Sequence, residues 1–163
     1  MRRFSRIFAW TTLFFVAGAV LFFTKAAALP YKVAWPVLLL SLATFLSRRR
    51  ELLPFGFAFL FSAAGDAVGA RGLFIPQMAF FALAHVAYVC WFLPRARRRL
   101  RAVSLAVTVP LLVFLFAAIV PEAPFTAERI GVAVYGLVIA AMLYSALQYD
   151  GACAAGFRCA ADR

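Results

Sequence analysis

Six long apolar runs, separated by short polar or basic segments, make up most of this chain. A helix needs about 20 mainly apolar residues to cross a membrane. The runs that approach this length are residues 7–23, 29–46, 52–68, 73–93, 102–120 and 130–147. They predict an all-α protein, a polytopic transmembrane helix bundle of about six spans. We expect residues 1–147 to form one membrane domain. Residues 148–163 are small, mixed in polarity and aperiodic, which predicts a cytoplasmic tail that is disordered or aberrant.

Two of these runs have features that favour a second interpretation. The second run contains Pro30, Lys32 and Pro36, and Lys32 lies near its end, where the ammonium group could extend to the headgroups. The first run resembles a secretory signal peptide, because basic residues precede it and residues 26–28 offer an A-x-A cleavage site. Its apolar core is slightly long for a signal peptide, so we favour a retained span. Cleavage would leave the orientation of the other five runs unchanged.

Composition supports a membrane protein and changes how its charge is interpreted. Hydrophobic residues make up 66% of the chain and the mean hydropathy is +0.94, whereas soluble domains are about 45–50% apolar. The net charge of +11 would suggest nucleic-acid binding in a soluble protein. Here the basic residues lie at the ends of the apolar runs. No basic folded surface is left for nucleic acid, so we expect none to bind.

Lysine and arginine are distributed unequally between alternate loops, and this predicts the orientation in the membrane. With the N-terminus inside, the outer loops hold four of the 17 basic residues and the inner segments hold the other 13. The four outer ones are Lys25, Lys32, Arg71 and Arg129. Basic loops stay in the cytoplasm, so we expect both termini to be cytoplasmic.

The third run carries a single charged residue, Asp66. An ionisable side chain at membrane depth is costly and usually functional. On a helix, Asp66 shares a face with Phe55, Phe59 and Ser62, and the small Gly65 beside it allows a neighbouring helix to approach closely. We therefore expect the carboxyl to point into the bundle or a cavity, where it could hold a proton and deliver it as a general acid.

The fourth run places three polar side chains on one aromatic helical face. That face consists of Phe74, Gln77, Phe81, His85, Tyr88 and Phe92. It suits a pocket for an amphiphile, with aromatic rings for a chain and polar groups for a headgroup or reacting bond. For each polar residue taken singly, the alternative is a hydrogen-bonded seam between helices. Counting from the intervening turn, Asp66 can meet Gln77 and is not expected to touch His85.

Other sequence motifs for catalysis are absent. The chain contains no GxGxxG, P-loop, HExxH or GxSxG motif. Of its three cysteines, Cys90 lies in a span, while Cys153 and Cys159 lie in the tail without metal-ligand spacing. These observations predict unpaired thiols, no metal site and no cofactor.

Residues 61–92 match a motif block of a known membrane-protein family. The matching features are Gly65–Asp66, a short turn, Phe74 before an apolar run, Phe80 or Phe81, Ala84–His85 and Tyr88. Weaker matches are Lys32, Tyr135 and Met142. On these residues the chain resembles the YhhN family, the lysoplasmalogenases, over roughly residues 30–147.

The resemblance implies an integral membrane hydrolase with about eight helical spans, so this chain would lack the family's C-terminal helices. The implied reaction cleaves the vinyl-ether bond of lysoplasmalogens and yields a fatty aldehyde and a glycerophospho-headgroup. The implied partner is a membrane lysophospholipid. The implied location is the bacterial cytoplasmic membrane, which the absence of an organellar signal also favours.

The resemblance also suggests roles for individual residues. Asp66 would be the catalytic acid or base, and Gln77, His85 and Tyr88 would line the substrate pocket. The outer basic residues Lys32, Arg71 and Arg129 could meet the phosphate. Since the turn after Asp66 is predicted to be outside, we expect the site to open to the non-cytoplasmic half of the membrane.

The chain departs from the family pattern at the second acidic motif, a Ser-Asp pair in a later apolar helix. The other acids near the C-terminus, Glu122, Glu128, Asp150 and Asp162, lie in loops or in the tail. A chain truncated or frameshifted after Leu147 could therefore be inactive. The alternative function is a non-enzymatic lipid- or solute-binding or transport protein, with Asp66 as a proton or cation site.

Overall fold

The computed structural model describes residues 2–23, 33–47, 49–97 and 100–149. These residues form helices joined by short connections, and no strand occurs among them. The α-helices are α1 (Arg2–Phe23), α2 (Trp35–Leu46), α3 (Leu53–Gly69), α4 (Phe74–Phe92), α5 (Arg101–Phe114) and α6 (Thr126–Leu147). A 3-10 turn, η1 (Arg50–Leu52), precedes α3, and a π-helical segment, η4 (Leu115–Ile119), continues α5. The predicted all-α class is confirmed.

Four helical stretches in the described part of the chain are long and apolar enough to cross a membrane. They are Arg50–Gly69, Phe74–Arg95, Arg101–Glu122 and Thr126–Leu147, which correspond to the last four predicted runs. The second run differs from expectation, because α2 has only 12 residues and begins at Trp35. Pro36 explains this start, since proline lacks an N–H and is favoured in the first turn of a helix.

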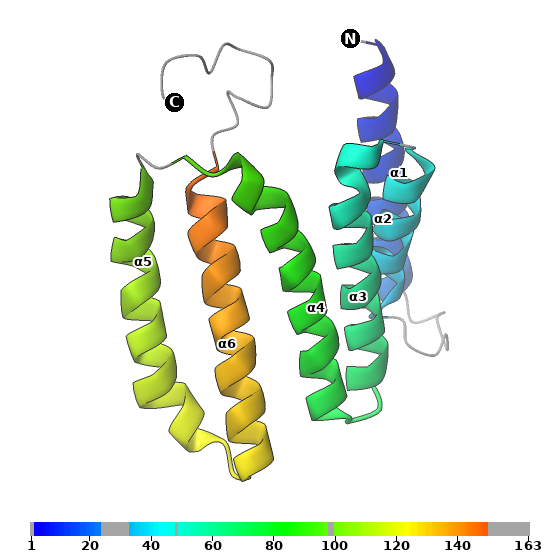
Figure 1. Cartoon of the computed structure of the whole chain (residues 1–163). Helices are drawn as coiled ribbons and strands as arrows, with labels where there is room; N and C mark the ends of the chain where they lie inside the picture. The colour runs from blue at the N-terminus through cyan, green and yellow to red at the C-terminus, as the bar shows by residue number, and fades with distance from the viewer. Residues whose placement is uncertain (1, 24–32, 48, 98–99, 150–163) are drawn as a thin grey trace.

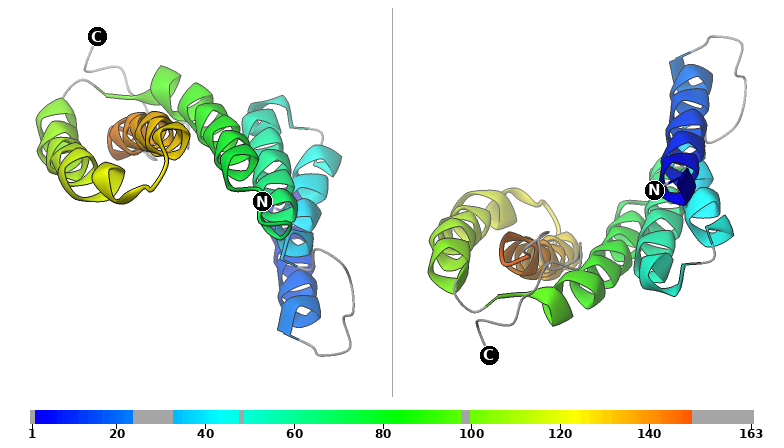
Figure 2. Two further views of the ribbon diagram at one scale, coloured as in Figure 1. Left: turned by 90° about the horizontal axis from the view of Figure 1, so that it is seen from below. Right: turned by 90° about the horizontal axis from the view of Figure 1, so that it is seen from above.

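The helices form an open row rather than a closed bundle (Figures 1 and 2). Neighbours in space follow the order α1, α2, α3, α4, α6, α5, so α4 packs between α3 and α6. The start of α1, the end of α2, the start of α3, the end of α4, the start of α5 and the end of α6 all lie at one end of the row (Figure 1). The described basic residues next to these helix ends therefore share that end, as the charge pattern predicts; they are Arg49, Arg50, Arg95, Arg97 and Arg101.

Small residues allow the helices to approach one another closely. Gly56 lies against the ring of Phe45, where an added Cβ would come within 2.7 Å of a ring carbon. Gly131 of α6 lies against Met78 of α4 in the same way. Between membrane helices such close packing, rather than burial from water, provides much of the attraction.

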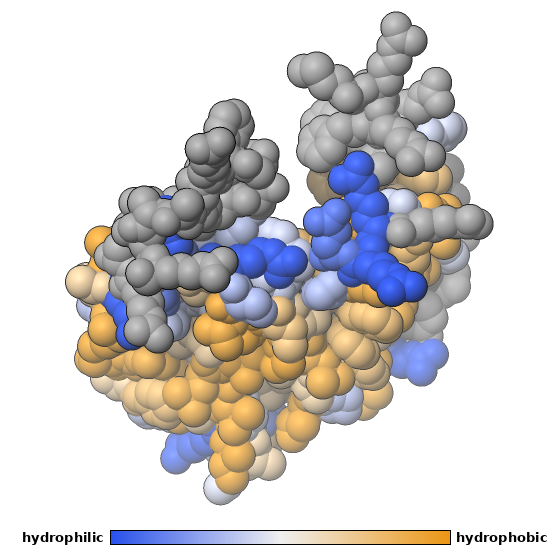
Figure 3. Space-filling model, turned by 45° about the horizontal axis from the view of Figure 1, so that its top comes forward, coloured by the Kyte–Doolittle hydropathy of each residue, from blue (hydrophilic) through white to orange (hydrophobic). Residues whose placement is uncertain are grey.

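Large apolar side chains cover the outer faces of the row. Phe23 is 81% exposed, Phe125 67% and Leu46 64%. Figure 3 shows this broad apolar surface beneath a band of hydrophilic side chains at one end. A soluble protein rarely exposes apolar patches of this extent, and lipid would solvate them favourably.

The C-terminal end of α6 packs against the basic C-terminal end of α4. The indole N–H of Trp91 donates to the Glu51 carbonyl at 2.9 Å, and the Arg95 guanidinium lies 4.6 Å from the centre of the Trp91 ring. Tyr149 packs its ring 5.0 Å from that of Trp91, and the Arg97 N–H donates to the Gln148 carbonyl at 2.9 Å. Two residues of the predicted tail are thus ordered, while residues 150–163 lie outside the described part.

Candidate functional site

Asp66 lies in the last turn of α3, where its side chain is partly buried. Its backbone carbonyl accepts the Ala70 N–H at 3.0 Å as the helix ends. Within the described part of the chain, the carboxyl group makes no hydrogen bond or ion pair. An acid at this depth without a protein partner is chemically available to a ligand or substrate.

Two glycines set the register between α3 and the antiparallel α4. A Cβ at Gly65 would lie 3.1 Å from ring carbons of Phe81, and one at Gly69 would collide with the side-chain amide of Gln77. Gly72, with a positive φ of 74°, makes the tight reversal between the helices. These contacts bring the ring of Phe81 and the side-chain amide of Gln77 against α3 at the two glycines that flank Asp66 in the sequence.

The positions along the helices keep His85 well removed from Asp66 in depth, as expected from the sequence. Asp66 lies three residues before the end of α3 and His85 lies eleven residues after the start of α4, so about eight residues, or about 12 Å at 1.5 Å per residue, separate their backbones along the axis. Gln77 lies three residues after the start of α4, close to the level of Asp66. Neither side chain hydrogen-bonds to the Asp66 carboxyl, so the expected meeting with Gln77 is not a hydrogen bond.

Aromatic rings lie on the face of α3 that carries Asp66, in the turns that precede it. Phe59, two helical turns earlier on that face, packs edge to face against Tyr88 of α4 with centroids 6.4 Å apart. Tyr88 lies 6.2 Å from His85, and His85 lies 5.6 Å from Tyr135 of α6. Three helices therefore contribute to one aromatic wall, which we define as Phe55, Phe59, Tyr88, His85 and Tyr135.

His85 forms a hydrogen bond within its own helix. Its Nδ1 lies 2.7 Å from the carbonyl oxygen of Phe81, one turn earlier in its own helix. The imidazole is thus not part of a hydrogen-bonded seam to a neighbouring helix, which was one sequence-based interpretation. Tyr135 enters the wall beside it, and sequence periodicity did not predict this because the contact between α4 and α6 is not local in the chain.

The basic residues that could meet a phosphate lie in different settings. Arg71 is exposed in the turn that follows α3, five residues after Asp66. Arg129 donates from Nε to the Ala123 carbonyl at 2.8 Å and from a terminal nitrogen to the Pro121 carbonyl at 3.2 Å. Its guanidinium therefore holds the connection before α6. Lys32 lies outside the described residues.

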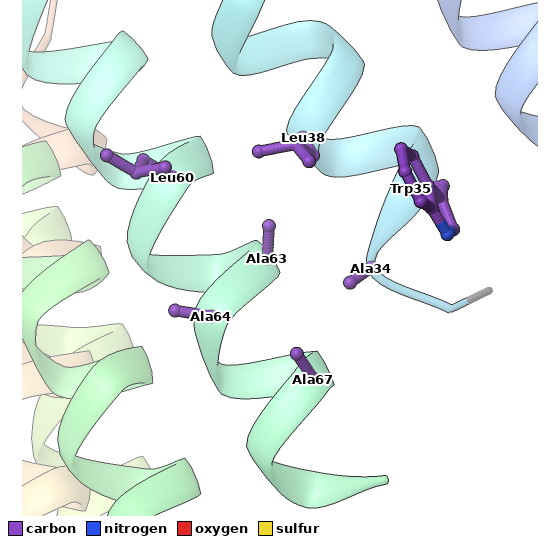
Figure 4. A pocket seen from close by; sticks show the side chains of 7 residues that line it. All are labelled: Ala34, Trp35, Leu38, Leu60, Ala63, Ala64 and Ala67. Carbon is purple, nitrogen blue, oxygen red and sulfur yellow. The ribbon is translucent and has the colours of Figure 1, made fainter. Parts of the chain in front are cut away.

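An apolar groove of about 390 Å³ lies between α2 and α3 and does not include Asp66. Figure 4 shows its lining: Ala34, Trp35, Leu38, Leu60, Ala63, Ala64 and Ala67. These α3 residues face α2, roughly a third of a turn around the helix from Asp66. In the described part of the chain no three His, Cys, Asp or Glu side chains cluster as metal ligands would.

Comparison with known proteins gives one match. A family model described as the YhhN family matches residues 27–161, which include α2 to α6 and all residues of the aromatic wall. No curated protein and no solved structure matches the chain.

Proposed function

This chain belongs to the YhhN family, and we propose that it is a membrane hydrolase that cleaves the vinyl-ether bond of lysoplasmalogens. The products would be a fatty aldehyde and a glycerophospho-headgroup. The observation that carries the proposal is Asp66, a carboxyl group in a membrane helix with no partner among the described residues. Such a group is difficult to explain as a purely structural element.

The chemistry of a vinyl ether suits a single well-placed acid. Protonation of the vinyl carbon gives an oxocarbenium ion, water adds to it, and the resulting hemiacetal collapses to aldehyde and alcohol. Asp66 is the proposed proton donor. The aromatic wall further along the same face of α3 could stabilise the cationic intermediate, since ring faces attract cations.

The open row of helices suits a substrate that arrives from the membrane. A lysolipid already lies with its chain in the bilayer, and the outer faces of the row are apolar. Gln77 and Tyr88 could hydrogen-bond to its oxygens, while Lys32 and Arg71 could meet its phosphate. The termini are proposed to lie in the cytoplasm, in a bacterial cytoplasmic membrane, with the site open to the opposite half of the bilayer.

A direct assay tests this function. Purified protein in nanodiscs is supplied with a vinyl-ether lysolipid, and aldehyde release is followed. The matched control is the saturated alkyl-ether lysolipid, which lacks the protonatable double bond. We expect aldehyde from the vinyl ether alone. Folded protein that releases no aldehyde from the vinyl-ether lysolipid would refute the proposal that this chain is a hydrolase.

A carrier or binding protein is the second candidate, favoured by the position of the remaining acids. Glu122 ends the connection after α5 and Glu128 lies in the first turn of α6, so neither is on the Asp66 face. A lone intramembrane carboxyl is typical of proton-coupled or cation-coupled carriers. In that case Asp66→Asn would change the pH dependence of lysolipid binding or transfer, and no covalent product would form.

A further inference from the structure

The hydrogen bond of His85 fixes the tautomer of its ring. A carbonyl oxygen can only accept a hydrogen bond, so the Nδ1 atom 2.7 Å from the Phe81 carbonyl carries the proton. In the neutral imidazole the lone pair then lies on Nε2. This is the arrangement of a general base that is oriented by its own helix.

The Nε2 atom of His85 has no hydrogen-bond partner among the described residues. The ring lies between Tyr88 of its own helix and Tyr135 of α6, both in edge-to-face contact with it. A histidine that served only to join helices would be expected to bond to one of them through this atom. The free lone pair is instead available to a small molecule in front of the aromatic wall.

The geometry of the two helices directs His85 and Asp66 toward each other. Side chains of an α-helix lean toward its N-terminus, and α3 and α4 are antiparallel. The His85 ring leans toward Phe81, and Asp66 leans toward Ser62, so the lean of both shortens the axial separation of about 12 Å between their backbones. Both also lie on the side of the α3–α4 pair that carries Phe59 and Tyr88.

We propose that His85 is the base that activates the attacking water, so that an acid and a histidine perform the work of two acidic groups. This inference rests on the proposed hydrolase function. A pair of catalytic groups that activates water between them is typically about 6.5–9.5 Å apart in inverting glycosidases. The lean of the two side chains brings Asp66 and His85 toward that range from a backbone separation of about 12 Å.

The proposed steps balance in protons and electrons. The Asp66 carboxyl gives its proton to the vinyl carbon, and the ether oxygen supplies electrons to form the oxocarbenium. Water adds to the carbon bonded to the ether oxygen as His85 Nε2 takes one of its protons, which gives a hemiacetal. The hemiacetal hydroxyl then returns a proton to Asp66 as the carbon–oxygen bond to glycerol breaks. The departing oxygen takes the proton from His85, and both residues recover their starting states.

The experiment uses purified protein in nanodiscs and a vinyl-ether lysolipid. We expect His85→Gln to lower kcat by about 10²- to 10⁴-fold with little change in KM, since glutamine cannot act as a base. Added imidazole should restore turnover to His85→Ala, which a structural role would not explain. Loss of the acidic limb of the pH profile, where a base would be protonated, should accompany His85→Gln. The other titratable groups at this wall, Asp66, Tyr88 and Tyr135, remain in that variant.

A second measurement separates this inference from the function on which it rests. His85 is the only histidine in the chain, so ¹⁵N NMR of the labelled wild-type protein reports one imidazole. We expect a protonated Nδ1 and an unprotonated Nε2. The opposite tautomer, or a kcat for His85→Gln within threefold of wild type, would overturn the inference. Wild-type protein that releases no aldehyde would refute the hydrolase itself, whatever the tautomer.

Discussion

The two faces of α3 offer opposite combinations of space and chemistry. The face toward α2 lines a groove of about 390 Å³ with leucine and alanine side chains. The face that carries Asp66 also carries Phe59, which packs against Tyr88 of α4, and Tyr88 in turn lies beside His85. The groove is large enough for part of a hydrocarbon chain, yet its lining among the described residues consists of alanine, leucine and one tryptophan, with no ionisable side chain. The comparison teaches that in a membrane protein the volume of a cavity is a weaker guide to the site than an ionisable group without a partner.

The largest effect is expected on the polar face, at Asp66. Asp66→Asn keeps the size of the side chain and removes the acid, so aldehyde release should fall by about 10²-fold or more. Glu128→Gln, at the start of α6, is the matched control and should retain wild-type turnover. Equal rates for both variants would show that the Asp66 face is not the reactive one.

A pair of neighbouring substitutions compares the two faces by packing alone. Gly65→Leu places a side chain where a Cβ already lies 3.1 Å from Phe81, so it should destabilise the protein by about 1–3 kcal/mol. Ala64→Leu points into the groove, which has room for it, and should leave the melting temperature nearly unchanged. Thermal unfolding in detergent measures both. A larger loss for Ala64→Leu would reverse the assignment of the faces.

The orientation of the two faces in the membrane can be tested with almost no change in activity. Ala70→Cys, in a background with the native cysteines replaced, marks the turn next to Asp66. We expect a membrane-impermeant thiol reagent to label it in intact cells. Ala102→Cys, at the opposite end of the row, should be labelled only after lysis. Labelling in the reverse order would place the Asp66 end in the cytoplasm.

Much of the fold was predictable because apolar runs and proline positions determine where membrane helices begin and end. The sequence placed Asp66, Phe55 and Phe59 on one face, and the contacts of Phe55 and Phe59 with Tyr88 agree with this for the two aromatic residues. It did not predict that the Phe81 ring packs on Gly65 and the Gln77 amide on Gly69, because these contacts depend on how α3 and α4 pack together.

Other features of the candidate site could not be predicted because they depend on contacts that are distant in sequence. Tyr135 reaches His85 only because α6 packs beside α4, with α5 on the outer side of α6. The side-chain rotamer that allows His85 to hydrogen-bond to the Phe81 carbonyl likewise cannot be inferred from a pattern of residues. The polar residues of the site were therefore predictable from the sequence, whereas the residues that they contact were not.

The most direct test of Asp66 as the proton donor measures deuterium from the solvent in the aldehyde product. The wild-type protein cleaves a vinyl-ether lysolipid in D₂O, the aldehyde is trapped as it forms, and its mass is measured. Protonation of the vinyl carbon by Asp66, which exchanges with solvent, predicts one deuterium on the carbon next to the aldehyde group. Asp66→Asn should yield almost no labelled aldehyde. Aldehyde without deuterium, or labelled aldehyde from Asp66→Asn at the wild-type rate, would contradict the claim that Asp66 is the acid.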